Sequence, residues 1–344
     1  MQKHTLYDQH HRPIHHLRIS LTDQCDFRCM YCMPPEGVSY LNSDKLLNNN
    51  QITRLAKVFL NLGIQKIRLT GGEPLLRKDI LPLVHDLAGL NHLDQLALTT
   101  NGNHLAKLAK PLADAGLKRI NISLDSLDND NFARLTKRQR LSSVLHGIHT
   151  ALDYFPVKVN VVILKGVNDH EIPDFIQWAL DHPLQELRFI EFMPLCGTGW
   201  KPQHVCPMTN TIEDLIQNYG GELINQEKDS VAESYHIHHK GKKARVGFIR
   251  TMSKPFCGHC SRIRLSADGT LRPCLFSHNG TSLKKIIEQG ANDEAIIKAI
   301  QDTVWQKPIG NDFFHEHQKN KDKPAYLNPE SQQTSYPAIR SIGG

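Results

Sequence analysis

Hydrophobic positions up to residue 195 follow two alternating patterns. Short apolar runs rich in β-branched residues, such as KIRLT and KVNVVIL, are followed by longer stretches in which apolar residues recur every three or four positions. The first pattern is typical of buried strands, and the second is typical of helices that bury one face. We therefore expect strands at 17–21, 66–70, 95–99, 119–124, 158–164 and 186–192, and helices near 44–62, 79–89, 103–115, 142–153 and 171–181.

Strands that alternate with helices predict βαβ units and a parallel sheet. Six units are too few for a closed eight-fold barrel, so we expect an α/β fold of the incomplete (β/α)6 TIM-like type over residues 1–195. The rhythm changes after residue 195, which predicts a C-terminal mixed α/β extension over 196–344. In this extension we expect helices near 209–219, 281–289 and 292–305, and strands at 231–238 and 244–250.

Nearly every predicted strand runs into a polar motif. A cysteine-rich loop follows the first strand, TGGEP (70–74) the second, TTNG (99–102) the third, SLD (123–125) the fourth and EFMP (191–194) the sixth. In α/β barrels the active site lies at the C-terminal ends of the strands. We therefore expect these motifs to share one rim of the sheet.

Composition and charge limit the class of protein. Hydrophobic residues make up 40% of the chain and charged residues 22%, with a mean hydropathy of −0.40, as in water-soluble globular proteins. No stretch approaches the roughly 20 apolar residues of a membrane span, and the N-terminus has no apolar signal-peptide core. We expect a cytoplasmic protein whose eight cysteines are metal ligands or free thiols. The net charge of +6 permits an anionic ligand and does not require nucleic acid.

The first cysteine group is Cys25, Cys29 and Cys32, spaced C-x3-C-x2-C. A structural zinc site takes four ligands, and no fourth cysteine lies nearby. A 4Fe–4S cluster needs three cysteines if its fourth iron stays open for a substrate. The spacing therefore favours such a cluster, with a ferredoxin-like electron carrier or a zinc loop as the alternatives.

The second cysteine group is Cys257, Cys260 and Cys274, spaced C-x2-C-x13-C. With His278 it matches a zinc ribbon, and without it a second three-cysteine cluster site. If SRIRLS is a strand, Arg262 and Arg264 point the same way, and two guanidinium groups suit a polyphosphate. This content favours a cluster beside a polyphosphate site.

The first cysteine loop, with Tyr31 just before its last cysteine and TGGEP one strand later, resembles the radical S-adenosylmethionine (SAM) enzymes. With the second cysteine group, the chain is similar to the branch of that superfamily that cyclises GTP in molybdenum cofactor biosynthesis. The resemblance runs from Arg18 to Leu275 and returns at the final Gly343-Gly344. It rests on LRISLTDQCDFRCMYCMP, IRLTGGEPLLR, LTTNG, ISLDSLD, KVNVV, LRFIEFMP and FCGHCSRIRL.

The resemblance implies two 4Fe–4S clusters, one on each cysteine group, with SAM as cosubstrate at the first. In this family the open iron of the second cluster faces the guanine of GTP. The resemblance implies that the SAM pocket is lined by Tyr31, Gly72, Ser123 and Met193. It implies that GTP is bound by Arg18, Arg68, Thr99, Lys158, Arg262 and Arg264, with Arg188 as a further candidate. The implied catalytic residues are Arg18, Arg262, Arg264, Gly343 and Gly344. One departure is Asp26, where the family commonly has Asn.

The implied reaction is radical cyclisation of GTP. A 5′-deoxyadenosyl radical takes the 3′ hydrogen of the ribose, the carbon radical attacks C8 of guanine, and the product is 3′,8-cyclo-7,8-dihydro-GTP. The resemblance further implies a flavodoxin- or ferredoxin-type electron donor, transfer of the product to cyclic pyranopterin monophosphate synthase, and a monomer or homodimer.

Two other functions remain open from the sequence. One is a different two-cluster radical SAM enzyme, such as one that modifies peptides. The other is a metal-containing nucleic-acid-binding protein, which predicts aromatic residues beside basic ones. Aromatic residues make up only 7% of the chain, and the basic run KGKKAR (240–245) contains none, so we expect that run to be a solvated hairpin turn.

Overall fold

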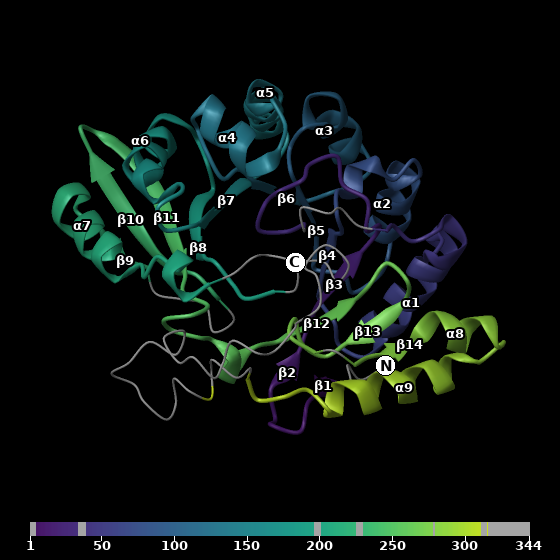
Figure 1. Cartoon of the computed structure of the whole chain (residues 1–344). Helices are drawn as coiled ribbons and strands as arrows, with labels where there is room; N and C mark the ends of the chain where they lie inside the picture. Colours follow the sequence, from purple (N-terminus) through teal and green to yellow (C-terminus); the bar gives the residue numbers. More distant parts are fainter. Residues whose placement is uncertain are drawn as a thin grey trace.

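The computed structural model (Figure 1) describes residues 5–33, 39–195, 201–224, 230–277, 279–310 and 315. Within these residues a mixed sheet of twelve strands forms the centre of the fold. Six consecutive parallel strands lie in its middle: β3 (His16–Ser20), β4 (Lys66–Thr70), β5 (Gln95–Thr100), β6 (Arg119–Ser123), β7 (Val157–Ile163) and β8 (Glu186–Glu191). A short separate hairpin pairs β1 (Leu6–Tyr7) with β2 (Pro13–Ile14).

Helices connect the six parallel strands. Since the strands follow chain order and such crossovers are right-handed, the connecting helices lie on one face of the sheet. Figure 1 shows them along its outer side. They are α1 (Asn49–Asn61), α2 (Ile80–Ala88), α3 (Leu105–Asp114), α4 (Asn129–Thr136), α5 (Leu141–Leu152) and α6 (Ile172–Asp181), with the 3-10 helices η1 (Ser43–Lys45), η2 (Pro74–Leu76) and η3 (Asp169–Glu171) between them.

The C-terminal part of the chain extends the sheet at both edges. Beyond β8 lie β11 (Lys242–Ile249), β10 (Glu233–His239) and β9 (Glu222–Leu223). Beyond β3 lie β12 (Arg262–Leu265), β13 (Thr270–Arg272) and β14 (Thr281–Ser282). The remaining helices described are η4 (Pro202–His204), α7 (Thr209–Tyr219), η5 (Cys257–His259), α8 (Leu283–Glu288) and α9 (Asp293–Trp305).

The two faces of the parallel strands differ sharply because side chains alternate along a strand. The face under the helices is apolar and belongs to one continuous hydrophobic core. Its strand residues are at most 2% exposed: Leu17, Ile19, Ile67, Leu69, Leu96, Leu98, Ile120, Ile122, Val159, Val161, Leu187 and Phe189. The opposite, inner face is polar and mainly basic, with His16, Arg18, Arg68, Thr99, Asn121, Lys158, Asn160, Glu186 and Arg188.

The six strands predicted from the sequence are confirmed to within a residue or two, as are the strands β10 and β11 and the helices after residue 195. The hairpin turn in KGKKAR is also confirmed, with positive φ at Lys240 and Gly241. The helix expected from residue 44 begins at Asn49, because Asn48 and Gln51 form a capping box. Helix α4 was not predicted; its eight residues are too few for a clear apolar period, although Asp128 caps it.

Candidate active site at the carboxyl ends of the parallel strands

The loop that carries the first cysteine group lies directly on the TGGEP turn. The amide of Gly72 donates to the Thr22 carbonyl (2.7 Å), and the amide of Glu73 donates to the Gln24 carbonyl (2.7 Å). A β-carbon at Gly71 would lie 2.5 Å from the Thr22 oxygen, and one at Gly72 would lie 2.2 Å from the Gln24 oxygen. The two glycines therefore allow one loop backbone to support the other.

Glu73 joins the ends of β4 and β5. Its carboxylate accepts hydrogen bonds from the Leu75 amide (2.9 Å), the Thr100 hydroxyl (2.7 Å) and the Asn101 amide (2.7 Å). The side chain is fully buried, and burial raises its pKa to about 7. Glu73 thus holds the TGGEP turn against TTNG.

The three cysteines of the first group are partly buried. Cys25 and Cys29 pack against the hydrophobic core, and the Asn101 amide nitrogen lies 3.9 Å from the Cys25 sulfur. Burial raises the pKa of Cys25 to about 12 and that of Cys29 well above its usual range. Such thiols stay protonated unless a metal centre displaces the proton, so the surroundings fit cluster ligands better than a free nucleophile.

Asp26 ties the cysteine loop to the segment after β5. Its carboxylate accepts from the side-chain amides of Asn101 (2.7 Å) and Asn103 (2.8 Å) and lies 3.0 Å from His104 Nε2. Its backbone carbonyl accepts from Arg138 Nε (2.7 Å). TTNG is recognisable in the sequence as a strand-end motif, but no local pattern indicates this role of Asn101.

Tyr31 reaches the end of β6. Its hydroxyl donates to Asp125 (2.5 Å), whose other carboxylate oxygen accepts from the Val162 amide (2.8 Å). Burial raises the pKa of Asp125 to about 6. Ser123 ends β6, and Met193 lies two residues after the end of β8. The four residues expected to line a SAM pocket, Tyr31, Gly72, Ser123 and Met193, therefore all lie at the carboxyl ends of the strands.

Most of the residues expected to bind GTP meet on the inner face. Arg18 is paired in register with Arg68 on one side and with Arg264 on the other. Arg68 donates to the Thr99 hydroxyl (3.4 Å). Burial and the neighbouring guanidinium groups lower the pKa of Arg68 to about 9 and that of Arg264 to about 10.

These arginines are left with unsatisfied hydrogen-bonding groups. The Nε atoms of Arg18, Arg68 and Arg264 are buried and have no hydrogen-bond partner in the part of the chain that the structure describes. Gathering like charges and buried donors costs stability. The arrangement therefore indicates a site for a ligand with several negative charges.

Lys158 and Arg188 differ from this group because they contact a carboxylate. Glu186 is fully buried and accepts from Lys158 Nζ (2.7 Å), Arg188 Nε (2.6 Å) and Arg245 Nε (3.1 Å). Burial favours a higher pKa for Glu186, but Arg188 and Lys158 outweigh it and lower the pKa to about 2. Burial lowers the pKa of Lys158 to about 8. The sequence offered no sign of Glu186.

The second cysteine group borders the basic face. Cys257 begins η5, Cys260 directly follows η5 and lies two residues before β12, and Cys274 follows β13. Burial works to raise the pKa of Cys260, but Lys307 and Arg262 outweigh it and lower the pKa to about 6. Arg262 and Arg264 lie near enough to this group for their charges to lower the pKa of the Cys260 thiol.

The described residues contain no group of three His, Cys, Asp or Glu side chains placed to hold a single ion. A 4Fe–4S cluster binds each thiolate through a different iron, so its ligands are farther apart than those of one zinc ion. The zinc-ribbon alternative depends on His278, which lies outside the described residues, as do Gly343 and Gly344.

A parallel α/β sheet with a three-cysteine loop at its carboxyl edge defines a cluster-dependent enzyme of the radical SAM class. The family profile of the Radical SAM superfamily matches residues 19–179, and that of Molybdenum Cofactor Synthesis C matches residues 185–313. The GTP 3′,8-cyclase of Thermodesulfovibrio yellowstonii is 43% identical over 91% of this chain and 96% of its own length. The chain belongs to the GTP 3′,8-cyclase family of the radical SAM superfamily, and it therefore uses 4Fe–4S chemistry and SAM.

Other relatives agree with this family. Molybdenum cofactor biosynthesis protein 1 of Dictyostelium discoideum is 39% identical over 95% of this chain, which spans about half of that longer protein (52%). The structure of Streptococcus suis SuiB bound to S-adenosylmethionine shares the fold, with a TM-score of 0.59 and 14% identity over 94% of this chain and 79% of its own. The match to the molybdenum cofactor profile sets aside the peptide-modifying and nucleic-acid-binding alternatives.

Proposed function

We propose that this chain is a GTP 3′,8-cyclase, which converts GTP to 3′,8-cyclo-7,8-dihydro-GTP in the first step of molybdenum cofactor biosynthesis. One observation carries the proposal. Among the residues that the structure describes, the buried Nε atoms of Arg18, Arg68 and Arg264 have no hydrogen-bond partner, and they lie on a basic strand face bordered by both cysteine groups. A nucleoside triphosphate supplies several acceptors and the negative charge that such a face lacks.

In this proposal the GTP site consists of Arg18, Arg68, Thr99, Lys158, Arg262 and Arg264, with Arg188 beside them. The guanidinium groups bind the triphosphate and hold the ribose toward the cysteine loop. Arg18, Arg262 and Arg264 also stabilise charge during the reaction. Gly343 and Gly344 remain predicted members of the active site.

The cysteine groups are proposed to hold two clusters. Cys25, Cys29 and Cys32 fit the first because they share one loop after β3, with Cys25 and Cys29 packed against the hydrophobic core. Tyr31, Gly72, Ser123 and Met193 would line the adjoining SAM pocket. Cys257, Cys260 and Cys274 fit the second, since they border the basic face, and the basic residues beside Cys260 favour its thiolate. When bound, the first cluster supplies the electron that cleaves SAM and starts the radical reaction.

The finer architecture follows from the same assignment. We propose that β3 to β8 act as an incomplete (β/α)6 barrel within residues 1–195, and that residues 196–344 form the extension that carries the second cluster. Its strands β11 and β12 pair with the two outer strands of the parallel set, which supports that division of labour.

The proposed partners follow from the reaction. A flavodoxin- or ferredoxin-type donor would supply electrons, and cyclic pyranopterin monophosphate synthase would take the product. A cytoplasmic monomer or homodimer fits both exchanges. In the described ranges no helix is both long enough and apolar enough to cross a bilayer.

The direct test combines metal content with activity. After anaerobic reconstitution we expect about eight irons per chain, and about four after Cys257→Ala, Cys260→Ala and Cys274→Ala are combined. With dithionite, SAM and GTP, the wild type should form the cyclised nucleotide and 5′-deoxyadenosine, whereas ATP should give no cyclised product. Four irons and one zinc in the wild type would contradict the second cluster, and the absence of cyclised product from fully loaded protein would contradict the GTP assignment.

A further inference from the structure

A buried lysine binds the backbone of the second cysteine site. Lys307, just after α9, is 2% exposed. Its ammonium donates to the Arg262 carbonyl (2.8 Å) and to the Pro273 carbonyl (2.7 Å). Arg262 follows Cys260 by two positions, and Pro273 directly precedes Cys274. One side chain therefore joins the two segments that carry these cysteines.

A buried arginine, Arg12, binds the backbone at the remaining cysteine, Cys257. Arg12 follows the turn of the N-terminal hairpin and is 5% exposed. Its guanidinium donates to the carbonyls of Cys257 (2.6 Å), Pro308 (2.6 Å) and Ile309 (2.9 Å), and it pairs with the buried Asp8 (2.7 Å). The hairpin thus connects Cys257 to the segment that carries Lys307.

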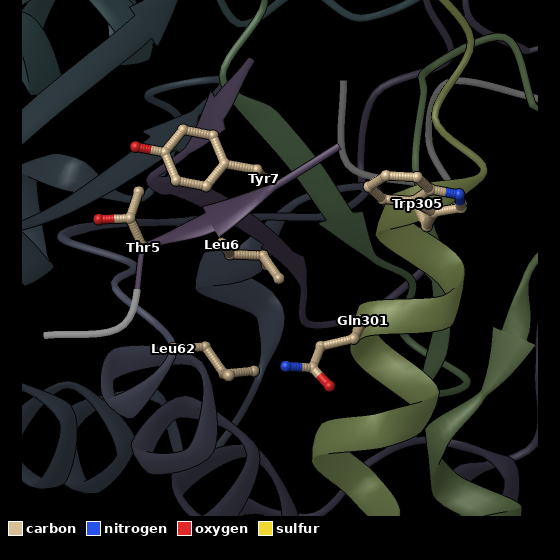
Figure 2. Close-up of a pocket in the computed structure, with 6 residues that line it drawn as sticks. All are labelled: Thr5, Leu6, Tyr7, Leu62, Gln301 and Trp305. Carbon is tan, nitrogen blue, oxygen red and sulfur yellow. The ribbon is translucent and has the colours of Figure 1, made fainter. Parts of the chain in front are cut away.

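The elements that present these two cations pack together. Strand β1 contacts α9, and Figure 2 shows them on two sides of a pocket of about 310 Å³. The pocket is lined by Thr5, Leu6, Tyr7, Leu62, Gln301 and Trp305. None of these side chains is charged, so this pocket does not suit GTP or SAM. The pocket lies at the contact between the N-terminal hairpin and α9, the two elements next to Arg12 and Lys307.

Lys307 differs from Arg12 in its charge balance. Arg12 has a carboxylate partner, but the hydrogen bonds of the Lys307 ammonium within the described residues all go to carbonyl groups. A buried ammonium is costly unless a negative charge lies near. The two carbonyls that Lys307 binds lie two residues after Cys260 and one residue before Cys274, so the ammonium lies beside both cysteine-bearing segments. Thiolates bound to a cluster would supply the missing negative charge.

We propose that Arg12 and Lys307 are positioning residues of the second cysteine site, and that Lys307 is also the buried counter-charge of the cluster held there. This inference rests on the second cluster of the proposed function. Together, the hydrogen bonds of Arg12 and Lys307 to the backbone form a clamp that fixes the chain beside all three cysteines. Loss of this clamp should loosen the cluster. The positive charge stabilises the reduced, more negative cluster, so its loss should lower the reduction potential.

Two substitutions separate these effects in the full-length, anaerobically reconstituted protein. Lys307→Met removes both the hydrogen bonds and the charge, whereas Lys307→Gln keeps an amide that can donate to both carbonyls. Lys298→Met is the matched control, because Lys298 lies on α9 and its side chain is 77% exposed. The readouts are iron content, the midpoint potentials from a redox titration followed by electron paramagnetic resonance, and SAM cleavage without GTP as a check on the first cluster.

For Lys307→Met we expect iron to fall from about eight toward about four per chain, with SAM cleavage retained. For Lys307→Gln we expect near-complete iron and a lower midpoint potential for one cluster. Lys298→Met should match the wild type. Complete iron and unchanged potentials in both Lys307 variants would overturn the inference. If Lys307→Met is insoluble, the midpoint potential of the cluster in Lys307→Gln tests the inference by itself.

The wild type separates this inference from the proposed function. Eight irons in the wild type and in both Lys307 variants, with unchanged potentials, would contradict the clamp and leave the second cluster intact. Four irons in the wild type would contradict the second cluster itself, and the inference with it.

Discussion

Gly72 lies so close to Gln24 that a β-carbon at Gly72 would sit 2.2 Å from the Gln24 carbonyl oxygen. The same oxygen accepts a hydrogen bond from the amide of the next residue, Glu73, at 2.7 Å. Gln24 directly precedes Cys25, so the glycine-rich turn shapes the start of the cysteine loop. The two motifs therefore work as one unit: the second motif supports the backbone of the first.

Gly72→Ala should disrupt the first cysteine loop. Its methyl group meets backbone atoms of Asp23 and Gln24, which cannot move aside as a flexible side chain would. We expect loss of most of the first-cluster iron and at least a tenfold loss of SAM cleavage. Gly89→Ala is the control, because its β-carbon would find only ordinary contacts, at 3.7 and 3.8 Å. Full iron and SAM cleavage in Gly72→Ala would show that the loops can separate without loss of the site.

Asp26 should stabilise the first cysteine loop through the acceptor oxygens of its carboxylate. Asp26→Ala leaves the side-chain amides of Asn101 and Asn103 without this partner, whereas Asp26→Asn keeps one acceptor oxygen. We expect a chelator to remove iron several-fold faster from Asp26→Ala, and at close to the wild-type rate from Asp26→Asn. Equal rates in all three proteins would mean that other contacts hold the loop.

Arg68 should lower the stability of the unliganded protein while it contributes to GTP binding. Its Nε is buried and has no partner within the described ranges, and its neighbours Arg188 and Arg262 carry the same charge. For Arg68→Met we expect a KM for GTP raised at least tenfold, with thermal stability of the unliganded protein equal to or above that of the wild type. The exposed Arg140 provides the control Arg140→Met, which should change neither quantity. A normal KM in Arg68→Met would remove this residue from the GTP site.

Lys158 should make GTP binding depend on pH. Burial lowers its pKa to about 8, so Lys158 is charged below that pH and loses its charge as the pH rises through it. The KM for GTP should therefore rise between pH 7.5 and 9, a window centred on about 8. In Lys158→Arg the rise should be absent, because a guanidinium stays protonated throughout this range. A wild-type profile identical to that of Lys158→Arg would show that Lys158 does not contact the triphosphate.

The strands and the strand-end motifs were predictable because they are local. A run such as KIRLT shows its burial in its own composition, and the parallel order follows from the strand–helix alternation. The strands β13 and β14 were not predicted: they are three and two residues long, and β13 pairs with β12 while β14 pairs with β13. The same holds for β1 and β2, whose two-residue pairing carries no periodic signal.

The sequence by itself determined the chemistry of this protein: two groups of three cysteines, a glycine pair one strand after the first, and basic residues at alternate strand positions. These features depend on spacing along the chain, which the sequence states directly. Tertiary structure alone decided the long-range contacts of the site, because their partners lie far apart in the chain. Glu186 binds Lys158, Asp26 joins Asn101, and Lys307 reaches the carbonyls beside Cys260 and Cys274. Such contacts follow from which segments the sheet brings together, and no local pattern encodes them.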